Sequence, residues 1–136
     1  MQVQKIFLID DDIDDQDIFI QALHSIDKTI QVSCAKDGQD ALDKINEPGF
    51  IAPDLIFLDL NMPRVNGKQF LAAYKQFDNC KNVPVIIYST SSQDTHMQET
   101  AALGASLFLV KPTKFSDLKT ILAKLITEDW KAMGNL

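Results

Sequence analysis

Short apolar stretches alternate along this chain with longer segments in which apolar residues recur every three or four positions. Short apolar runs are typical of strands buried on both faces, and the longer spacing is typical of amphipathic helices. The predicted strands are Lys5–Ile9, Ile30–Cys34, Leu55–Leu58, Val83–Tyr88 and Leu107–Val110. The predicted helices are Asp14–Ile26, one opened by Asp37-Gly38 and closed by Pro48-Gly49, and then Asn66–Phe77, Asp94–Leu103 and Ser116–Ile126.

This strict alternation predicts an α/β fold with a parallel sheet and helices on both of its faces. Five strand–helix units within 136 residues favour the doubly wound, flavodoxin-like strand order 2-1-3-4-5. We expect one domain over residues 1–127, followed by a short C-terminal tail over 128–136 with no output domain. The last helix should bury a broad apolar face made of Phe115, Leu118, Ile121, Leu122 and Ile126.

The charge balance narrows the classes of partner. With 19 acidic and 13 basic residues, the net charge is −6, which argues against DNA binding because phosphate backbones attract basic surfaces. The apolar runs are too short for membrane insertion, and the first residues lack the features of a secretion signal. Cys34 and Cys80 have no paired spacing, so free thiols and a cytoplasmic location are expected.

Polar residues that suit chemistry follow the ends of the predicted strands. Asp10-Asp11 follows the first strand, Asp59 the third, Ser89 the fourth and Lys111 the fifth. The carboxyl ends of parallel strands share one edge, where open α/β sheets bind ligands. Clustered carboxylates repel by roughly 4 kcal/mol per pair at 4 Å, so they must raise their pKa values or recruit a cation. Carboxylates suit Mg²⁺, and an ammonium and a hydroxyl suit a phosphate.

Each of these residues also has an ordinary structural explanation. Asp10 could simply end a strand before a helix, and Asp59 could cap the helix that follows it. Ser89 could serve as a hydroxyl at the start of a helix, and Lys111 could be a turn residue before Pro112. Their coincidence at one edge of the sheet favours a shared site.

The order of these residues resembles the receiver domain of two-component response regulators, and the resemblance covers nearly the whole chain. That family has an acidic pair after strand one, an aspartate after strand three, Thr or Ser after strand four and Lys-Pro after strand five. The intervals here are 30 residues from Asp59 to Ser89 and 22 from Ser89 to Lys111, similar to those of single-domain chemotaxis regulators. The resemblance implies a phosphoprotein that acts in phosphorelay signal transduction.

The resemblance also implies roles for the acidic residues. Asp59 would be the phosphoacceptor and would bind Mg²⁺ together with Asp11 and the backbone carbonyl of Asn61, with Asp10 bound through water. Asn61 and Ser91 would occupy positions that tune the lifetime of the phosphoryl group.

Further implied roles concern the switch. Lys111 would contact the phosphoryl oxygens, and the Lys111-Pro112 bond would be cis to aim its ammonium into the cleft. Ser89 would move to bond the phosphoryl group, and the switch aromatic Phe108 would then rotate. The face built from helix four, strand five and helix five would change shape and bind a partner.

On this interpretation the protein is a signalling phosphoacceptor and not an enzyme. Its phosphoryl donor would be a sensor histidine kinase or a histidine phosphotransfer protein. The sequence does not identify the downstream protein. The resemblance also allows a phosphorylation-dependent dimer. One alternative is a Mg²⁺-dependent aspartyl-phosphate phosphatase of the haloacid-dehalogenase type, although Asn61 stands where such enzymes carry their acid. Another is a phosphorylation-independent interaction module, against which the intact acidic residues speak.

Overall fold

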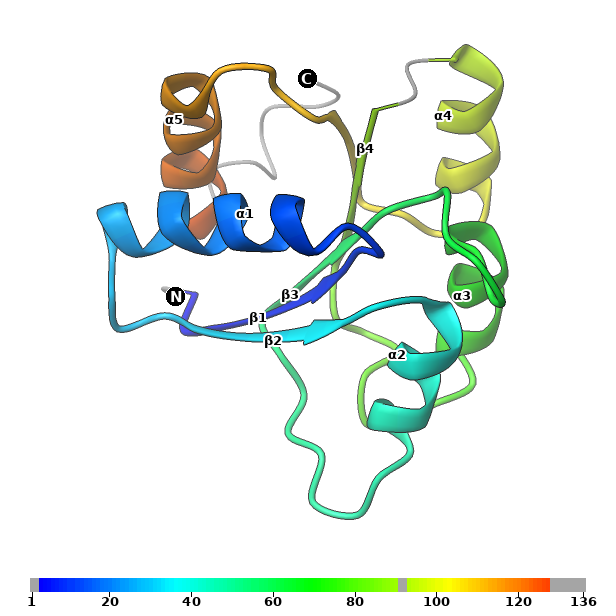
Figure 1. Cartoon of the computed structure of the whole chain (residues 1–136). Helices are drawn as coiled ribbons and strands as arrows, with labels where there is room; N and C mark the ends of the chain where they lie inside the picture. Colours follow the sequence, from blue (N-terminus) through cyan, green and yellow to red (C-terminus); the bar gives the residue numbers. More distant parts are fainter. Residues whose placement is uncertain (1–2, 91–92, 128–136) are drawn as a thin grey trace.

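The strands form one parallel sheet in the order β2-β1-β3-β4-β5, which confirms the predicted doubly wound α/β fold (Figure 1). The computed structural model describes residues 3–90 and 93–127. The strands are β1 (Lys5–Ile9), β2 (Gln31–Ala35), β3 (Leu55–Leu58), β4 (Val85–Ser89) and β5 (Leu107–Val110). The helices are α1 (Ile13–Ile26), α2 (Gly38–Ile45), α3 (Gly67–Tyr74), α4 (Asp94–Ala102) and α5 (Phe115–Ile126).

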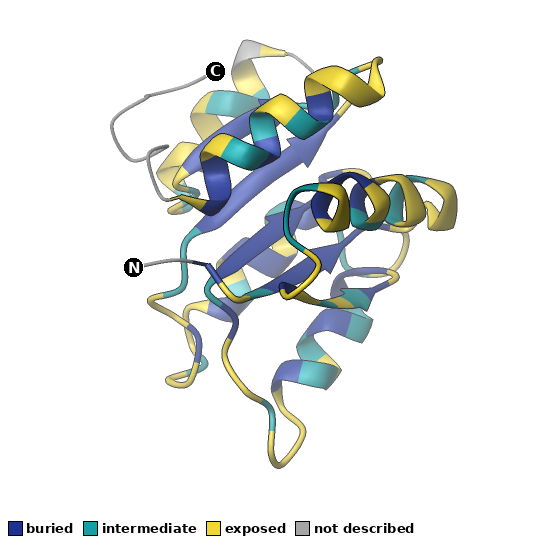
Figure 2. Ribbon diagram, turned by 90° about the vertical axis from the view of Figure 1, so that its left-hand side faces the viewer, coloured by how far each residue is buried: buried dark blue, intermediate teal, exposed yellow. Residues whose placement is uncertain are grey.

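Helices cover both faces of the sheet, α1 and α5 on one side and α2, α3 and α4 on the other. Alternate strand residues point to opposite faces, so the sheet supports two apolar clusters. Phe19, Phe57 and Tyr88 meet edge-on in the α1–α5 cluster, and Phe7 and Phe70 belong to the opposite one. Figure 2 shows the strands buried between helices whose outer faces are exposed. None of the helices described is both long and apolar enough to span a bilayer.

Differences from the predicted boundaries have local causes. β4 begins at Val85 and not at Val83, because Pro84 has no N–H to donate to the sheet. α3 ends at Tyr74, after which Gln76 and Phe77 N–H groups bond three residues back, in tight turns that end the helix. β2 is shifted by one residue to Gln31–Ala35, at the edge of the sheet.

The apolar face predicted for the last helix is wrong at its first position. Leu118, Leu122 and Ile126 are buried, and Ile121 packs against the same cluster. Phe115 is 44% exposed, because it is the first residue of α5 and lies at the margin of the core. The ammonium of Lys119 lies 6.0 Å from the centroid of its ring. The tail predicted over 128–136 lies outside the described residues.

Candidate functional site

The register of the sheet brings the predicted polar residues to one edge. Ile9 is the partner of Leu58, and the N–H of Asp59 donates to the carbonyl of Ile9 at 2.9 Å, so Asp10 and Asp59 lie side by side. On the other side of β3, Ser89 ends β4 and is the partner of Val110 in β5. The next N–H, that of Lys111, donates to the carbonyl of Ser89 at 2.8 Å. Parallel pairing thus positions these residues without any contribution from loops.

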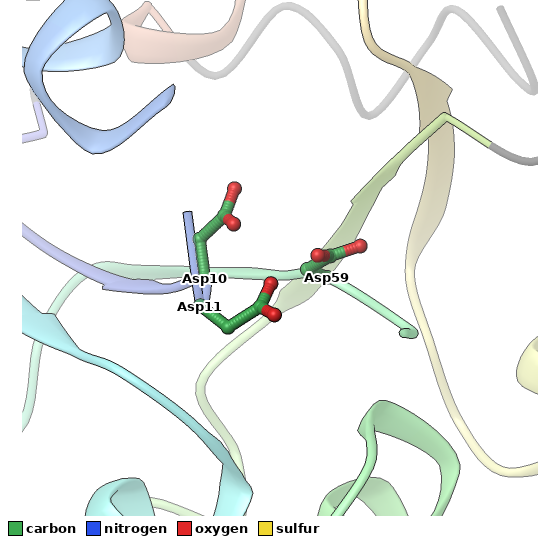
Figure 3. Close-up of side chains that lie close together, drawn as sticks. All are labelled: Asp10, Asp11 and Asp59. Carbon is green, nitrogen blue, oxygen red and sulfur yellow. The ribbon is translucent and has the colours of Figure 1, made fainter. Parts of the chain in front are cut away.

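Three carboxylates meet at this edge. Asp10 and Asp11 project from the end of β1 beside Asp59, and oxygens of the three side chains lie within 4.8 Å of one another (Figure 3). Asp10 and Asp59 are only 1% and 7% exposed, whereas Asp11 faces solvent. Burial raises the pKa of Asp59 to about 6; the ammonium of Lys111 opposes this shift and the charge of Asp10 adds to it. Burial also raises the pKa of Asp10.

Lys111 neutralises part of this charge. Its ammonium lies 2.8 Å from Asp10 Oδ2, 2.9 Å from Asp15 Oδ2 and 3.9 Å from Asp59 Oδ2. The side chain is 10% exposed, and the ammonium stands 5.4 Å from the centroid of the Tyr88 ring. Burial alone would lower the pKa of Lys111, but pairing with Asp10 and Asp15 raises it above its ordinary value. One cation is therefore shared among several carboxylates.

Helix capping does not explain the places of Asp10, Asp59 or Ser89 in this structure. Asp12, not Asp10, caps α1 by accepting hydrogen bonds from backbone N–H groups. Asn66 caps α3 in a capping box with Gln69, so Asp59 does not serve that helix. Ser89 is fully buried as the last residue of β4, before the polar segment that leads to α4.

The prediction of a cis Lys111–Pro112 bond is wrong, because every peptide bond of the described chain is trans. The flexible side chain of Lys111 reaches the carboxylates from a trans backbone, so the bond does not have to turn the ammonium into the cleft.

The other predicted residues surround this cleft or lie beyond it. Phe108 is 3% exposed in β5 and belongs to the cluster that α2, α3 and α4 cover. Asn61 is exposed and lies two residues after Asp59, where the chain leaves β3. Ser91 lies outside the described residues. The geometry thus places Asn61 two residues after Asp59 and Phe108 within the core, and it assigns neither of them a role.

The sequence did not indicate two contacts at this edge of the sheet. Asp15, in the first turn of α1 where acidic residues favour the start of a helix, also accepts a hydrogen bond from Lys111. Asp37 accepts two hydrogen bonds from the guanidinium of Arg64, at 2.9 and 3.0 Å, and so ties the start of α2 to the loop after β3. Arg64 has a positive φ of 61°, which nothing in the local sequence indicates. Both contacts join residues far apart in the chain.

With fold and cleft established, comparison with known proteins identifies the family. The model of the response regulator receiver domain matches residues 6–123, and the chain belongs to this family. The probable methanogenesis regulatory protein FilR2 of Methanothrix harundinacea is 28% identical over 128 residues, covering 92% of this chain and 82% of that protein. Other relatives are longer: the chain spans 34% of a protein-glutamate methylesterase/protein-glutamine glutaminase of Methanospirillum hungatei, with which it is 35% identical.

Solved structures agree in fold over nearly the full length. The phosphorylated cyanobacterial phytochrome response regulator RcpA is 30% identical, with a TM-score of 0.81 over 97% of this chain and 96% of that one. The Mn²⁺-bound form of response regulator Rcp1 is 26% identical, with a TM-score of 0.79 over 93% of this chain and 94% of that one. The likeness in fold therefore covers nearly the whole of this chain and of both solved structures.

Proposed function

We propose that the protein is a response regulator of a two-component system whose Asp59 accepts a phosphoryl group from a phosphohistidine. The donor is a sensor histidine kinase or a histidine phosphotransfer protein, and the protein is a signalling phosphoacceptor without a separate substrate. The observation that carries the proposal is the place of Asp59, almost buried between two acidic residues and the ammonium of Lys111. Membership of the receiver family and the likeness to phosphorylated RcpA support it.

The chemistry follows from the environment of Asp59. With a pKa of about 6, its carboxylate is largely ionised at neutral pH and is a competent nucleophile. An oxygen of Asp59 attacks phosphorus, the phosphorus–nitrogen bond of the donor breaks, and its electron pair stays on the imidazole. The product is an acyl phosphate. The ammonium of Lys111, 3.9 Å from Asp59, is close enough to stabilise the charge on the transferring oxygens after a small movement.

The acidic residues fit a divalent cation. Their oxygens lie within 4.8 Å of one another, and Lys111 is the one cation that the structure pairs with this cluster of described residues. Hard carboxylate oxygens are the donors that Mg²⁺ takes. Asp11, Asp59 and the carbonyl of Asn61 would hold the ion, with Asp10 bound through water. Bound Mg²⁺ would neutralise charge on the phosphoryl oxygens. Asn61 and Ser91 are proposed to tune how long the phosphoryl group stays on Asp59.

The proposed switch couples the cleft to a surface. After transfer, Ser89 and Lys111 bond the phosphoryl oxygens, and Phe108 moves within its cluster beneath α4. The α4–β5–α5 face then changes shape and binds a downstream partner. A second copy of the chain is one such partner. Moving such an equilibrium from 1:99 to 99:1 takes about 5.5 kcal/mol. Charge-assisted hydrogen bonds of roughly 1.5–3 kcal/mol each supply this only if Ser89 and Lys111 both contribute. A cytoplasmic location fits this role.

Intact mass after treatment with acetyl phosphate and Mg²⁺ tests the acceptor. We expect one added phosphoryl group, lost in hydroxylamine, in wild type and in the control Asp78→Asn, whose carboxylate is exposed. Asp59→Asn should take up none. Phosphate found on Ser89 would refute the assignment. Turnover of a generic phosphate ester would favour the phosphatase, and no uptake by folded wild type would favour a phosphorylation-independent module.

Amide chemical shifts with and without the phosphoryl mimic beryllofluoride test the switch. In wild type we expect changes in the cleft and also in α4, β5 and α5. Ser89→Ala should keep the changes in the cleft and weaken those on the distant face. Shifts confined to the cleft in wild type would contradict the proposed switch while leaving the acceptor chemistry intact.

A further inference from the structure

Lys111 has an anchor that the acceptor chemistry does not require. Its ammonium donates a hydrogen bond of 2.9 Å to Asp15 Oδ2 in the first turn of α1, and it pairs with Asp10 at 2.8 Å. Asp59 Oδ2 is 3.9 Å away, beyond hydrogen-bonding distance. The ammonium therefore rests on the α1 side of the cleft, drawn away from the acceptor.

The position of Asp15 is fixed by the way α1 begins. Asp12 Oδ1 accepts hydrogen bonds from the N–H groups of Asp14 and Asp15, and the N–H of Asp12 donates to Asp10 Oδ1 at 3.0 Å. The start of the helix is thereby tied to the end of β1, and Asp15 is aimed at the cleft. Its side chain is 35% exposed, whereas Asp14 and Asp17 are exposed residues of the same helix. Among these three acids, Asp15 is the one whose carboxylate bonds Lys111.

On the basis of the proposed function, we propose that Asp15 is a positioning residue that holds Lys111 in a resting place and competes with the phosphoryl group for its ammonium. In this structure the ammonium donates a hydrogen bond to Asp15 and forms an ion pair with Asp10. A phosphoryl group on Asp59 offers anionic oxygens to the same protons, so Lys111 must weaken its contact with Asp15 to bond them. Asp15 thus lowers the affinity of the cleft for the phosphoryl group and raises the threshold of the switch.

Two aspartate-to-asparagine variants separate this role from general charge. Asp15→Asn and Asp17→Asn each remove one negative charge from α1, but only the first takes that charge from a carboxylate that contacts Lys111. In the presence of Mg²⁺, the affinity for beryllofluoride, measured from amide shifts, should be about tenfold higher in Asp15→Asn than in Asp17→Asn. This factor corresponds to the lower end of the free energies of charge-assisted hydrogen bonds, because the Asp15 carboxylate is partly exposed. The concentration of acetyl phosphate at half-maximal rate should fall in Asp15→Asn in parallel.

A second measurement follows the ammonium in the free protein. The Lys111 ammonium signal in a ¹⁵N lysine side-chain spectrum, assigned with Lys111→Met, should be resolved in wild type and Asp17→Asn because the ion pairs slow its proton exchange. It should broaden or disappear in Asp15→Asn. A resting contact predicts this loss, and a general effect of charge does not.

The outcomes are distinct. Equal beryllofluoride affinities in Asp15→Asn and Asp17→Asn, or weaker binding in Asp15→Asn, would overturn the competition while leaving the proposed function standing. An unchanged ammonium signal in Asp15→Asn would overturn the resting contact itself. Failure of wild type to bind beryllofluoride would overturn the proposed function and this inference together.

Discussion

Two neighbouring acid–base groups stand at the same edge of the sheet and differ in how many carboxylates share one cation. Asp37 is paired with one guanidinium, that of Arg64, and its Oδ1 also accepts from the N–H of Asp40 at 2.8 Å. In the cleft, the ammonium of Lys111 lies within 3.9 Å of oxygens from Asp10, Asp15 and Asp59. We call the first group the Asp37 clamp and the second the Asp59 cleft.

The pKa values of the two aspartates shift in opposite directions. The hydrogen bonds from Arg64 hold the pKa of Asp37 below its ordinary value of 3.8, whereas burial raises that of Asp59 to about 6. A carboxylate with its own cation is satisfied and joins two loops. Carboxylates that share one cation keep an excess of negative charge. This excess suits the binding of a metal ion and the proposed role of Asp59 as the acceptor of a phosphoryl group. The same residue types thus make a structural tie in one place and the proposed acceptor site in the other.

Removing the shared cation should produce the largest effect. In Lys111→Met the buried Asp10 loses its partner, and the free energy of unfolding at pH 7 should fall by about 3 kcal/mol, as when a buried ion pair is broken. The loss should shrink in mild acid, because the carboxylates can then take up protons. Urea unfolding at both pH values measures it. The control is Lys81→Met, whose partner Asp78 is 93% exposed; equal losses in the two variants would contradict the argument.

Asp59→Asn should stabilise the unphosphorylated protein. Because the folded-state pKa of Asp59 is raised to about 6, the folded state binds its proton more tightly than the unfolded chain. Wild type therefore loses stability as pH rises from about 4 to about 6, and the cost persists above that range. Asparagine should remove this dependence and give about 2 kcal/mol more stability at pH 7, with little difference at pH 4. A variant less stable than wild type at pH 7 would show that the cleft is better neutralised than its geometry indicates.

Asp37→Asn should have the opposite sign. The pKa of Asp37 is lowered, so its stabilising contribution is present above 3.8 and is lost as pH falls through the folded-state pKa. Asparagine can still cap α2 but cannot form the ion pair, and because Arg64 is 53% exposed we expect a loss of only about 1 kcal/mol at pH 7. The loss should diminish in acid. Thermal unfolding beside Asp59→Asn gives the comparison directly, and a stabilised Asp37→Asn would break it.

The sequence predicts the centre of the fold better than its margins. The central strands Lys5–Ile9 and Leu55–Leu58 are found with the predicted bounds, because apolar runs buried on both faces end where a charged residue leaves the sheet. Predictions fail where neighbours outside the element decide. The edge strand β2 is shifted by one residue, and Phe115 is exposed because α5 begins at the margin of the core.

Some contacts of the site could likewise be predicted from the sequence and others could not. Asp10, Asp59, Ser89 and Lys111 are gathered by strand register alone, so their meeting follows once the strand order is known. The contact of Lys111 with Asp15 also depends on the rotation of α1 about its axis and on a side-chain rotamer. No periodic pattern in the sequence encodes those angles. The Lys111–Pro112 bond was predicted to be cis from the family resemblance alone, and the bond is trans.

The smallest effect should come from an ion pair that solvent reaches. Lys68 and Glu99 pair across α3 and α4, with side chains 30% and 56% exposed. The hydrogen bond from Lys68 lowers the pKa of Glu99, yet water and salt screen an exposed pair, so Glu99→Gln should leave the midpoint of thermal unfolding unchanged within error. Differential scanning fluorimetry at low and high salt checks this, with Asp37→Asn alongside. A loss in Glu99→Gln as large as that in Asp37→Asn would mean that pairing itself, whatever its exposure, sets the stability of this edge. An unchanged midpoint would leave the number of carboxylates per cation as the feature that separates the Asp37 clamp from the Asp59 cleft.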